Sequence, residues 1–215
     1  MSDLMSRIAA DLRPVRPVRS AETRSAAVLA LAAIAGALLL ATIGMRHDLA
    51  SFASPWFVAM LLARVAAGAL LIFLALKDAI PASGTVGTVM KTAAAFGVVV
   101  LLALPPLYAW CVGSSSTSVG PMFCYPLILA VALPSFAGLL WLLLRAYPLH
   151  PLRTAALAGL GSGILAEAAL FVACSNSAAA HGSLVHGGAG VTIAIFGAVA
   201  GWLIAVRRRR ELGIS

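Results

Sequence analysis

Charged residues are scarce in this sequence, making up only 10% of its 215 residues, whereas about a quarter is usual in soluble domains. Hydrophobic residues make up 62%. A water-soluble fold needs a polar surface, and a chain with so few polar side chains does not provide one. The composition therefore excludes a soluble enzyme, a secreted disulfide scaffold, a disordered chain and a coiled coil, and it indicates a polytopic membrane protein.

Acidic residues and catalytic motifs are also few. Asp and Glu number 7 against 15 Lys and Arg, which gives a net charge of +8. In a membrane protein such an excess sets the topology, so we expect no direct contact with nucleic acid. The sequence contains no His-Glu-x-x-His zinc motif, no nucleophile elbow and no Cys-x-x-Cys pair, which are signatures of common enzyme classes. It therefore predicts a protein that is not an enzyme.

Six apolar runs are each long enough to cross a membrane, which takes about 20 residues in a helix. They cover residues 26–45, 56–76, 92–112, 124–144, 154–174 and 189–206. The first run is too long for the apolar core of a signal peptide, so we interpret it as an uncleaved span. No intervening loop is long enough to fold as a domain. The sequence predicts an all-α fold, with six transmembrane helices over 26–206, an N-terminal segment over 1–25 and a basic tail over 207–215.

The basic residues predict the orientation of this bundle. Most of them precede the first span, flank the second and fourth loops, or follow the last span as Arg207–Arg210. Of the other two, Arg46 lies alone in the first loop and Arg64 lies inside the second span. Because Lys and Arg concentrate in cytoplasmic loops, we expect both termini in the cytoplasm. We interpret Arg207–Arg210 as an anchor at the lipid headgroups of the bilayer.

Three cysteines and two histidines lie at the predicted outer face. Each cysteine can be a small apolar residue at a helix end, or the group can form a thiol cluster that is oxidised or binds a soft metal ion. Cys111 and Cys124 bracket one short loop and can approach each other, although the spacing matches no established zinc motif. The candidate sensing residues are Cys111, Cys124, Cys174, His181 and His186, and all of these except Cys111 are candidate ligands of a transient soft metal ion. No resident cofactor is predicted.

Two charged residues lie inside the spans at similar depth. Arg64 is eight residues from the outer end of the second span, and Glu167 is seven residues from the outer end of the fifth. A lone charge at this depth is costly, so we expect an intramembrane ion pair, with a proton or ion relay as the alternative. Glycines in the last two spans predict close helix packing: Gly159, Gly161, Gly163, Gly197 and Gly201.

The N-terminal segment contains a short amphipathic pattern. Leu4, Ile8 and Leu12 fall on one helical face, which Met5 widens. The following Arg-Pro-Val-Arg-Pro-Val-Arg sequence predicts an extended basic stalk, because proline stops the helix. A short isolated helix is marginally stable and suits docking into an apolar groove of a soluble partner. A helix lying flat on anionic lipid is the alternative.

Four of these features occur together. They are the Leu-Arg-Pro-Val sequence at 12–15 after a short amphipathic helix, the six spans, Cys124 opening the fourth span, and Cys174 closing a Gly/Ala-rich fifth span. In this combination the chain resembles the NrsF family, polytopic bacterial anti-sigma factors that restrain an extracytoplasmic-function sigma factor. The resemblance implies that the N-terminal segment binds the sigma factor, and that Cys124 and Cys174 correspond to the family's paired cysteines. The chain departs from the family where Ser-Asn-Ser-Ala and two histidines follow Cys174 in place of an aromatic-rich stretch.

These observations favour a membrane anti-sigma factor that acts in transcription regulation and stress response. Such a protein would hold an extracytoplasmic-function sigma factor at the inner membrane and release it when outer-face cysteines sense a signal, for which a metal ion or an oxidant is the candidate. The alternative is a small transporter or permease for a metal ion or organic solute. Glu167, the outer histidines and the prolines inside the third and fourth spans, which are Pro105, Pro106 and Pro134, would serve it. The residues expected to bind the partner are Leu4, Met5, Ile8, Leu12, Arg13 and Val15.

Overall fold

The computed structural model describes residues 19–47, 52–80, 87–114, 119, 122–146 and 148–211. These residues form seven helical elements and no strand. The elements are α2 (Ala21–Ile43), α3 (Pro55–Asp78), α4 (Gly87–Cys111), α5 (Cys124–Ala146), α6 (Pro151–Ala173), η3 (His181–Gly187) and α7 (Gly188–Glu211). The predicted N-terminal helix and the six partner-binding residues assigned to that segment lie outside the described residues.

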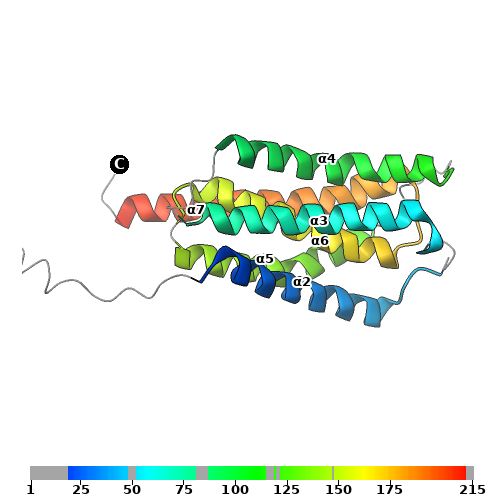
Figure 1. Ribbon diagram of the computed structural model, residues 1–215, viewed down its shortest axis with the longest axis horizontal. Coiled ribbons are helices and arrows are strands. Elements are labelled where there is room, and N and C mark those ends of the chain that lie inside the picture. The colour runs from blue at the N-terminus through cyan, green and yellow to red at the C-terminus, as the bar shows by residue number, and fades with distance from the viewer. Residues whose placement is uncertain are drawn as a thin grey trace, which may run out of the picture.

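Six helices are long and apolar enough to span a membrane, which confirms the predicted all-α bundle. Successive helices run in opposite directions, so that α2, α4 and α6 begin at the end of the bundle where α7 finishes (Figure 1). The sixth span is longer than predicted and covers His181–Glu211. This difference arises because η3 continues into α7 without a break.

Local sequence explains several helix ends. The hydroxyl of Ser20 accepts a hydrogen bond from the backbone N–H of Thr23 at 3.3 Å and caps the start of α2. Pro55 and Pro151 occupy the first positions of α3 and α6, where the missing N–H of proline costs nothing. After α2, Gly44 adopts a φ of +82°, a conformation that glycine reaches without steric strain.

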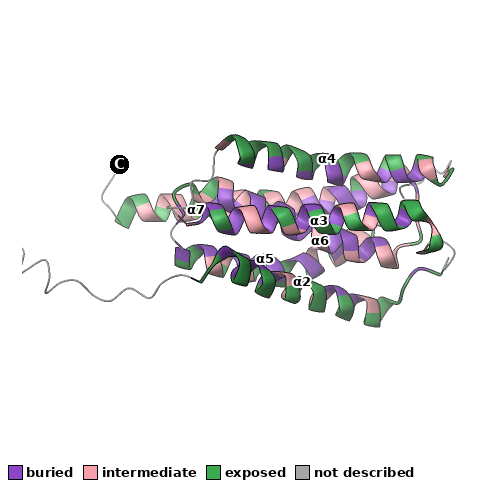
Figure 2. Cartoon of the chain, viewed as in Figure 1, coloured by how far each residue is buried: buried purple, intermediate pink, exposed green. Residues whose placement is uncertain are grey.

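Helix α6 lies at the centre of the bundle and packs against α2, α3, α4, α5 and α7. Its glycines make this possible, as their spacing predicts. A Cβ atom on Gly163 would lie 2.8 Å from the Cα atom of Gly190 in α7, so the two backbones are in direct contact. The outward faces of α2 and α4 are instead largely exposed (Figure 2). Leu38, Phe96 and Trp110 are among the large apolar side chains there, as expected for surfaces that face lipid.

Candidate thiol–imidazole site

The site is built beside the stretch of α4 that contains Pro105 and Pro106. Proline has no N–H, so it leaves a carbonyl one turn earlier without its helical partner. Ser183 in η3 donates a hydrogen bond to one such carbonyl, that of Leu102, at 3.2 Å. Gly187 fits against the same stretch, since a Cβ atom there would lie 2.9 Å from the carbonyl oxygen of Leu101. The prolines of α4 therefore provide the surface on which η3 is seated.

Four side chains converge beside this contact, and we call them the thiol–imidazole cluster: Cys124, Cys174, His181 and His186. Each offers one potential ligand atom, and these atoms lie within 4.8 Å of one another. The two sulfur atoms are 3.9 Å apart, and the sulfur of Cys174 is 3.4 Å from Nε2 of His181. Both histidines are almost completely buried. The cluster therefore gathers residues from the start of α5, the end of α6 and η3.

The π-helical form of η3 brings the two imidazoles together. A π-helix forms i→i+5 hydrogen bonds, so residues five apart in the sequence lie near one face. His181 and His186 have this spacing, and their ring centroids are 4.9 Å apart. The predicted spans 154–174 and 189–206 left both histidines in the loop between them, and this prediction was wrong. Short π-helical segments are rare and concentrate at functional sites, and their sequences carry no periodic signal that would have revealed this one.

Each imidazole has one ring nitrogen engaged outside the cluster and one available to it. Nδ1 of His181 contacts the backbone carbonyl of Val119, so this nitrogen carries the proton and Nε2 presents a lone pair toward Cys174. Nδ1 of His186 lies 3.6 Å from a carboxylate oxygen of Glu167, while its buried Nε2 has no hydrogen-bond partner among the described residues. In metal sites, a contact of this kind to the ring nitrogen that does not bind the metal orients the histidine.

The cluster distances suit a tetrahedral site for a soft or borderline metal ion. Metal–sulfur bonds of about 2.3 Å and metal–nitrogen bonds of about 2.0–2.1 Å give ligand–ligand separations of roughly 3.3–3.8 Å in a tetrahedron. The observed 3.9 and 3.4 Å lie close to this range. The buried and unpaired Nε2 of His186 supplies a fourth donor. Two thiolates and two imidazoles are a donor set that zinc and similar ions accept.

Charge around the cluster favours a thiolate at Cys174, which lies just beyond the end of α6. The thiol of Cys124 donates a hydrogen bond to the sulfur of Cys174, and this bond lowers the pKa of the Cys174 thiol well below its ordinary value. His186 also lowers this pKa, while burial acts in the opposite direction. Thiolates are the reactive form of cysteine toward metals and oxidants, so Cys174 is the more reactive sulfur of the pair.

Directly beneath the cluster, Arg64 and Glu167 lie in contact with a separation of 2.5 Å between Nε and Oε2. A cavity of about 20 Å³ joins this pair to Cys174 and His186, and it is large enough for one water molecule. Glu167 contacts Arg64 through one oxygen and His186 through the other. The ion pair and the thiol–imidazole cluster therefore form one continuous polar region inside an apolar bundle.

Two further outcomes concern residues at the same end of the bundle. The structure does not bring Cys111 into the cluster with the other two cysteines, because Cys124 contacts Cys174 instead. Arg46, which the sequence placed alone in a loop, is buried; its guanidinium lies 5.4 Å from the ring centroid of Phe57 and 3.5 Å from the hydroxyl of Ser177. Sequence reasoning missed this contact, because nothing in the spacing relates Arg46 to either partner.

The fold and the cluster together define a multi-pass membrane protein with a buried thiol–imidazole site at one end of its bundle. The chain belongs to the NrsF family, described as a negative regulator of sigma F, whose sequence profile matches residues 8–205. No curated protein and no solved structure matches the chain. The matched range includes most of the N-terminal segment and the first five spans, and it ends within the sixth.

Proposed function

We propose that this protein is an anti-sigma factor of the bacterial inner membrane. Its N-terminal segment sequesters an extracytoplasmic-function sigma factor in the cytoplasm, and a signal at the opposite face releases it. Membership of a family of negative regulators is the observation that carries the proposal. The amphipathic pattern of Leu4, Ile8 and Leu12 supports the choice of segment, because three apolar side chains on one helical face suit a groove in a soluble partner.

The distribution of charge supports this orientation. Lys77, Lys91, Arg145 and Arg153 lie at the end of the bundle where α7 finishes in Arg207–Arg210. We call this the basic end (Figure 1). The positive-inside rule assigns such an end to the cytoplasm. The thiol–imidazole cluster lies at the opposite end, which then faces the periplasm, where disulfides persist.

Two chemistries fit the cluster as the signal. A soft metal ion would bind the Cys124 and Cys174 thiolates with His181 and His186 and displace the thiol protons. Alternatively, an oxidant of the peroxide or quinone class would take two electrons from the Cys124 thiol and the Cys174 thiolate, with release of the Cys124 proton, and leave a disulfide. The sulfur atoms, now 3.9 Å apart, would then approach to about 2.05 Å. Disulfide formation draws the start of α5 toward the end of α6, whereas a bound metal ion would hold the two helix ends near their present separation.

Movement of α5 against α6 can reach the basic end, because the short connection from Ala146 to Pro151 joins the two helices there. Arg208 of α7 donates a hydrogen bond to the carbonyl of Pro148 within this connection, at 3.1 Å. The connection is therefore linked to the C-terminal helix as well. A signal acts through this route only if it binds more tightly to the conformation that releases the sigma factor than to the conformation that captures it.

Replacement of Leu4, Ile8 and Leu12 by Ala tests sigma-factor capture. Each buried Leu or Ile side chain contributes about 1.5–3 kcal/mol, so the triple variant should lose micromolar binding. The measurement is copurification of the sigma factor with the detergent-solubilised protein. Asp3→Ala with Ser6→Ala is the matched control, because it alters the same segment without removing an apolar contact. Full recovery of the partner by the triple variant would refute docking through this segment.

Two double variants test signal sensing in cells that report sigma-factor activity. Cys124→Ser with Cys174→Ser should still capture the partner but no longer release it under metal or oxidant challenge. His181→Ala with His186→Ala should lose the response to metal and keep the response to oxidant, because a disulfide needs only the thiols. Normal release from the cysteine double variant would remove the thiols from the mechanism.

A further inference from the structure

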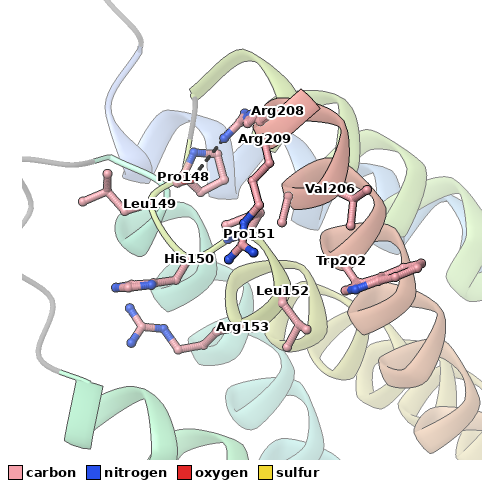
Figure 3. Close-up of a pocket in the computed structure, with 11 residues that line it drawn as sticks. Pro148, Leu149, His150, Pro151, Leu152, Arg153, Trp202, Val206, Arg208 and Arg209 are labelled. Atoms are coloured by element: carbon pink, nitrogen blue, oxygen red, sulfur yellow. Dashed lines mark hydrogen bonds between the residues drawn. The ribbon is translucent and has the colours of Figure 1, made fainter. Parts of the chain in front are cut away.

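The basic end contains a cavity of about 570 Å³ between the start of α6 and the end of α7 (Figure 3). Its lining combines cationic and apolar side chains, including Arg153, Arg208, Arg209, Leu152, Trp202 and Val206. Arg208 bonds to the carbonyl of Pro148, while the Arg209 side chain extends toward Pro151 at the first turn of α6 (Figure 3). The cavity therefore places arginine beside the N-terminus of a long helix.

The charges around this cavity favour an anion. The N-terminus of a helix carries a partial positive charge, and α6 has no acidic residue in its first turn. Asp78 accepts hydrogen bonds from Arg153 at 2.6 Å and Thr154 at 2.7 Å, so one acidic group balances Arg153. Among the described residues, no acidic side chain lines the cavity itself. An anion placed between Arg209 and the start of α6 would reduce the repulsion between them.

An apolar groove of about 480 Å³ adjoins the cavity and runs along α4, α6 and α7. Leu152 and Arg153 line both spaces, so the two lie side by side. Small side chains leave the groove open, among them Ala94, Ala156 and Ala198. Lys91 lies at its rim together with Arg153, and its remaining lining is apolar. The combined space is thus cationic at one end and apolar along its length.

The depth of this space matches the level of lipid headgroups. The apolar stretch of α7 ends at Val206 and Arg207–Arg210 follow it directly, so these arginines lie where the helix leaves the hydrocarbon core. Trp202 is half exposed at the cavity mouth, a position at which tryptophan concentrates in membrane proteins. The cationic cavity therefore faces lipid phosphates, and the apolar groove faces lipid chains.

We propose that this cavity and groove form a specific binding site for an anionic phospholipid. The phosphate would lie against Arg209 and Arg208 beside the first turn of α6, and one acyl chain would occupy the groove between α4, α6 and α7. The site is distinct from the thiol–imidazole cluster and does not rest on sigma-factor binding. Its ligand lies in the same leaflet as the basic end.

Native mass spectrometry of the detergent-solubilised full-length protein tests this proposal. The probes are phosphatidylglycerol and phosphatidylcholine with identical acyl chains. The wild-type protein should retain phosphatidylglycerol preferentially. Arg208→Gln and Arg209→Gln should each weaken retention roughly fivefold, because each removes a cation that contacts the phosphate in the cavity. Arg210→Gln is the matched control, because Arg210 belongs to the same helix and does not line the cavity.

A second pair of variants tests the groove without changing charge. Ala198→Phe fills the groove and should reduce retention of phosphatidylglycerol. Val199→Phe should not, because Val199 is exposed on the same helix and lies outside the groove. Size-exclusion chromatography of each variant checks that the bundle remains folded, so a loss of retention can be assigned to the site.

Four results would overturn the proposal. The first is equal retention of the two lipids, and the second is equal retention by the Arg209→Gln and Arg210→Gln variants. The third is full competition by inorganic phosphate or glycerol phosphate at millimolar concentration, which would identify a site for a free anion. In the fourth, the Arg208→Gln/Arg209→Gln double variant retains phosphatidylglycerol as the wild-type protein does, but a cytoplasmic protein no longer copurifies with it. That result would identify the cavity as a protein-docking surface.

Discussion

The guanidinium Nε of Arg64 lies 2.5 Å from Oε2 of Glu167 in the interior of the bundle and joins α3 to α6. The same guanidinium donates a hydrogen bond to the carbonyl of Met60 at 2.9 Å. It also lies 4.3 Å from the ring centroid of Phe171. Both charged side chains are almost fully buried. Each charge is therefore compensated by a specific partner rather than by water.

Removal of one member of this pair should be strongly destabilising. Arg64→Met or Glu167→Leu leaves one buried charge uncompensated, which costs about 3–5 kcal/mol. The Arg64→Met/Glu167→Leu protein should recover much of this loss, because two apolar side chains need no partner. Thermal unfolding of the purified protein, followed by tryptophan fluorescence, measures the three variants against wild type.

The exposed pair of Arg207 and Glu211, separated by 3.0 Å, provides the control for this cycle. Water screens such pairs and they contribute little to stability. Arg207→Met and Glu211→Leu should therefore leave the unfolding temperature nearly unchanged. Additive effects of Arg64→Met and Glu167→Leu would contradict an energetic coupling between the two buried residues.

The spans and the depth of Arg64 and Glu167 were predictable from the sequence. Apolar length defines a span, and a rise of 1.5 Å per residue converts position into depth. These quantities do not define which helix faces are in contact. The approach of Cys124 to Cys174 was expected from the family resemblance. Loop length alone indicated that Cys124 can approach Cys111. Tertiary packing determines such contacts, and the periodicity of the sequence does not predict how the helices pack.

The position of the histidines was not predictable for a different reason. The sequence around His181 and His186 is rich in glycine and alanine, which indicates a loop as readily as a helix. It becomes helical because Pro105 and Pro106 leave carbonyls of α4 available and because glycines permit close contact there. This cause lies in another helix, so it is invisible to an interpretation of the local sequence.

Close contact between α6 and α7 predicts opposite effects for two Gly→Ala changes. A Cβ atom on Gly163 would lie 2.8 Å from Cα and 2.9 Å from the carbonyl oxygen of Gly190. These are backbone atoms that cannot move aside, so Gly163→Ala should destabilise the bundle by about 1–3 kcal/mol. On Gly188 the nearest atom would be a ring carbon of Tyr125 at 3.8 Å.

Gly188→Ala should consequently be tolerated and should add stability of up to about 1 kcal/mol, because alanine favours a helix over glycine. The unfolding temperatures of the two variants, measured under the same detergent conditions, make the comparison. Equal effects of the two changes would show that the contact between Gly163 and Gly190 does not limit packing.

The hydrogen bond from Cys124 to Cys174 predicts how thiol reactivity depends on pH. An ordinary cysteine has a pKa of about 8.5, and its reaction rate with iodoacetamide falls as the pH drops through that value and the thiolate is protonated. The pKa of Cys174 is lowered because Cys124 donates a hydrogen bond to its sulfur. Its thiolate should therefore persist, and its rate should stay high, at pH values well below 8.5.

Cys124→Ala removes this donor and should raise the pKa of Cys174, so the fall in alkylation rate should move to higher pH. Cys124→Ser keeps a hydroxyl donor at the same position and should preserve more of the low-pH reactivity. Both are measured in a Cys111→Ser background, by mass spectrometry of the alkylated peptide containing Cys174. The His186 imidazole and Glu167 remain in place in both variants, so a difference between Ala and Ser reports the donor itself. Identical pH profiles in the wild-type and Cys124→Ala proteins would mean that Cys124 does not stabilise the thiolate, and Cys174 would lose its assignment as the more reactive sulfur.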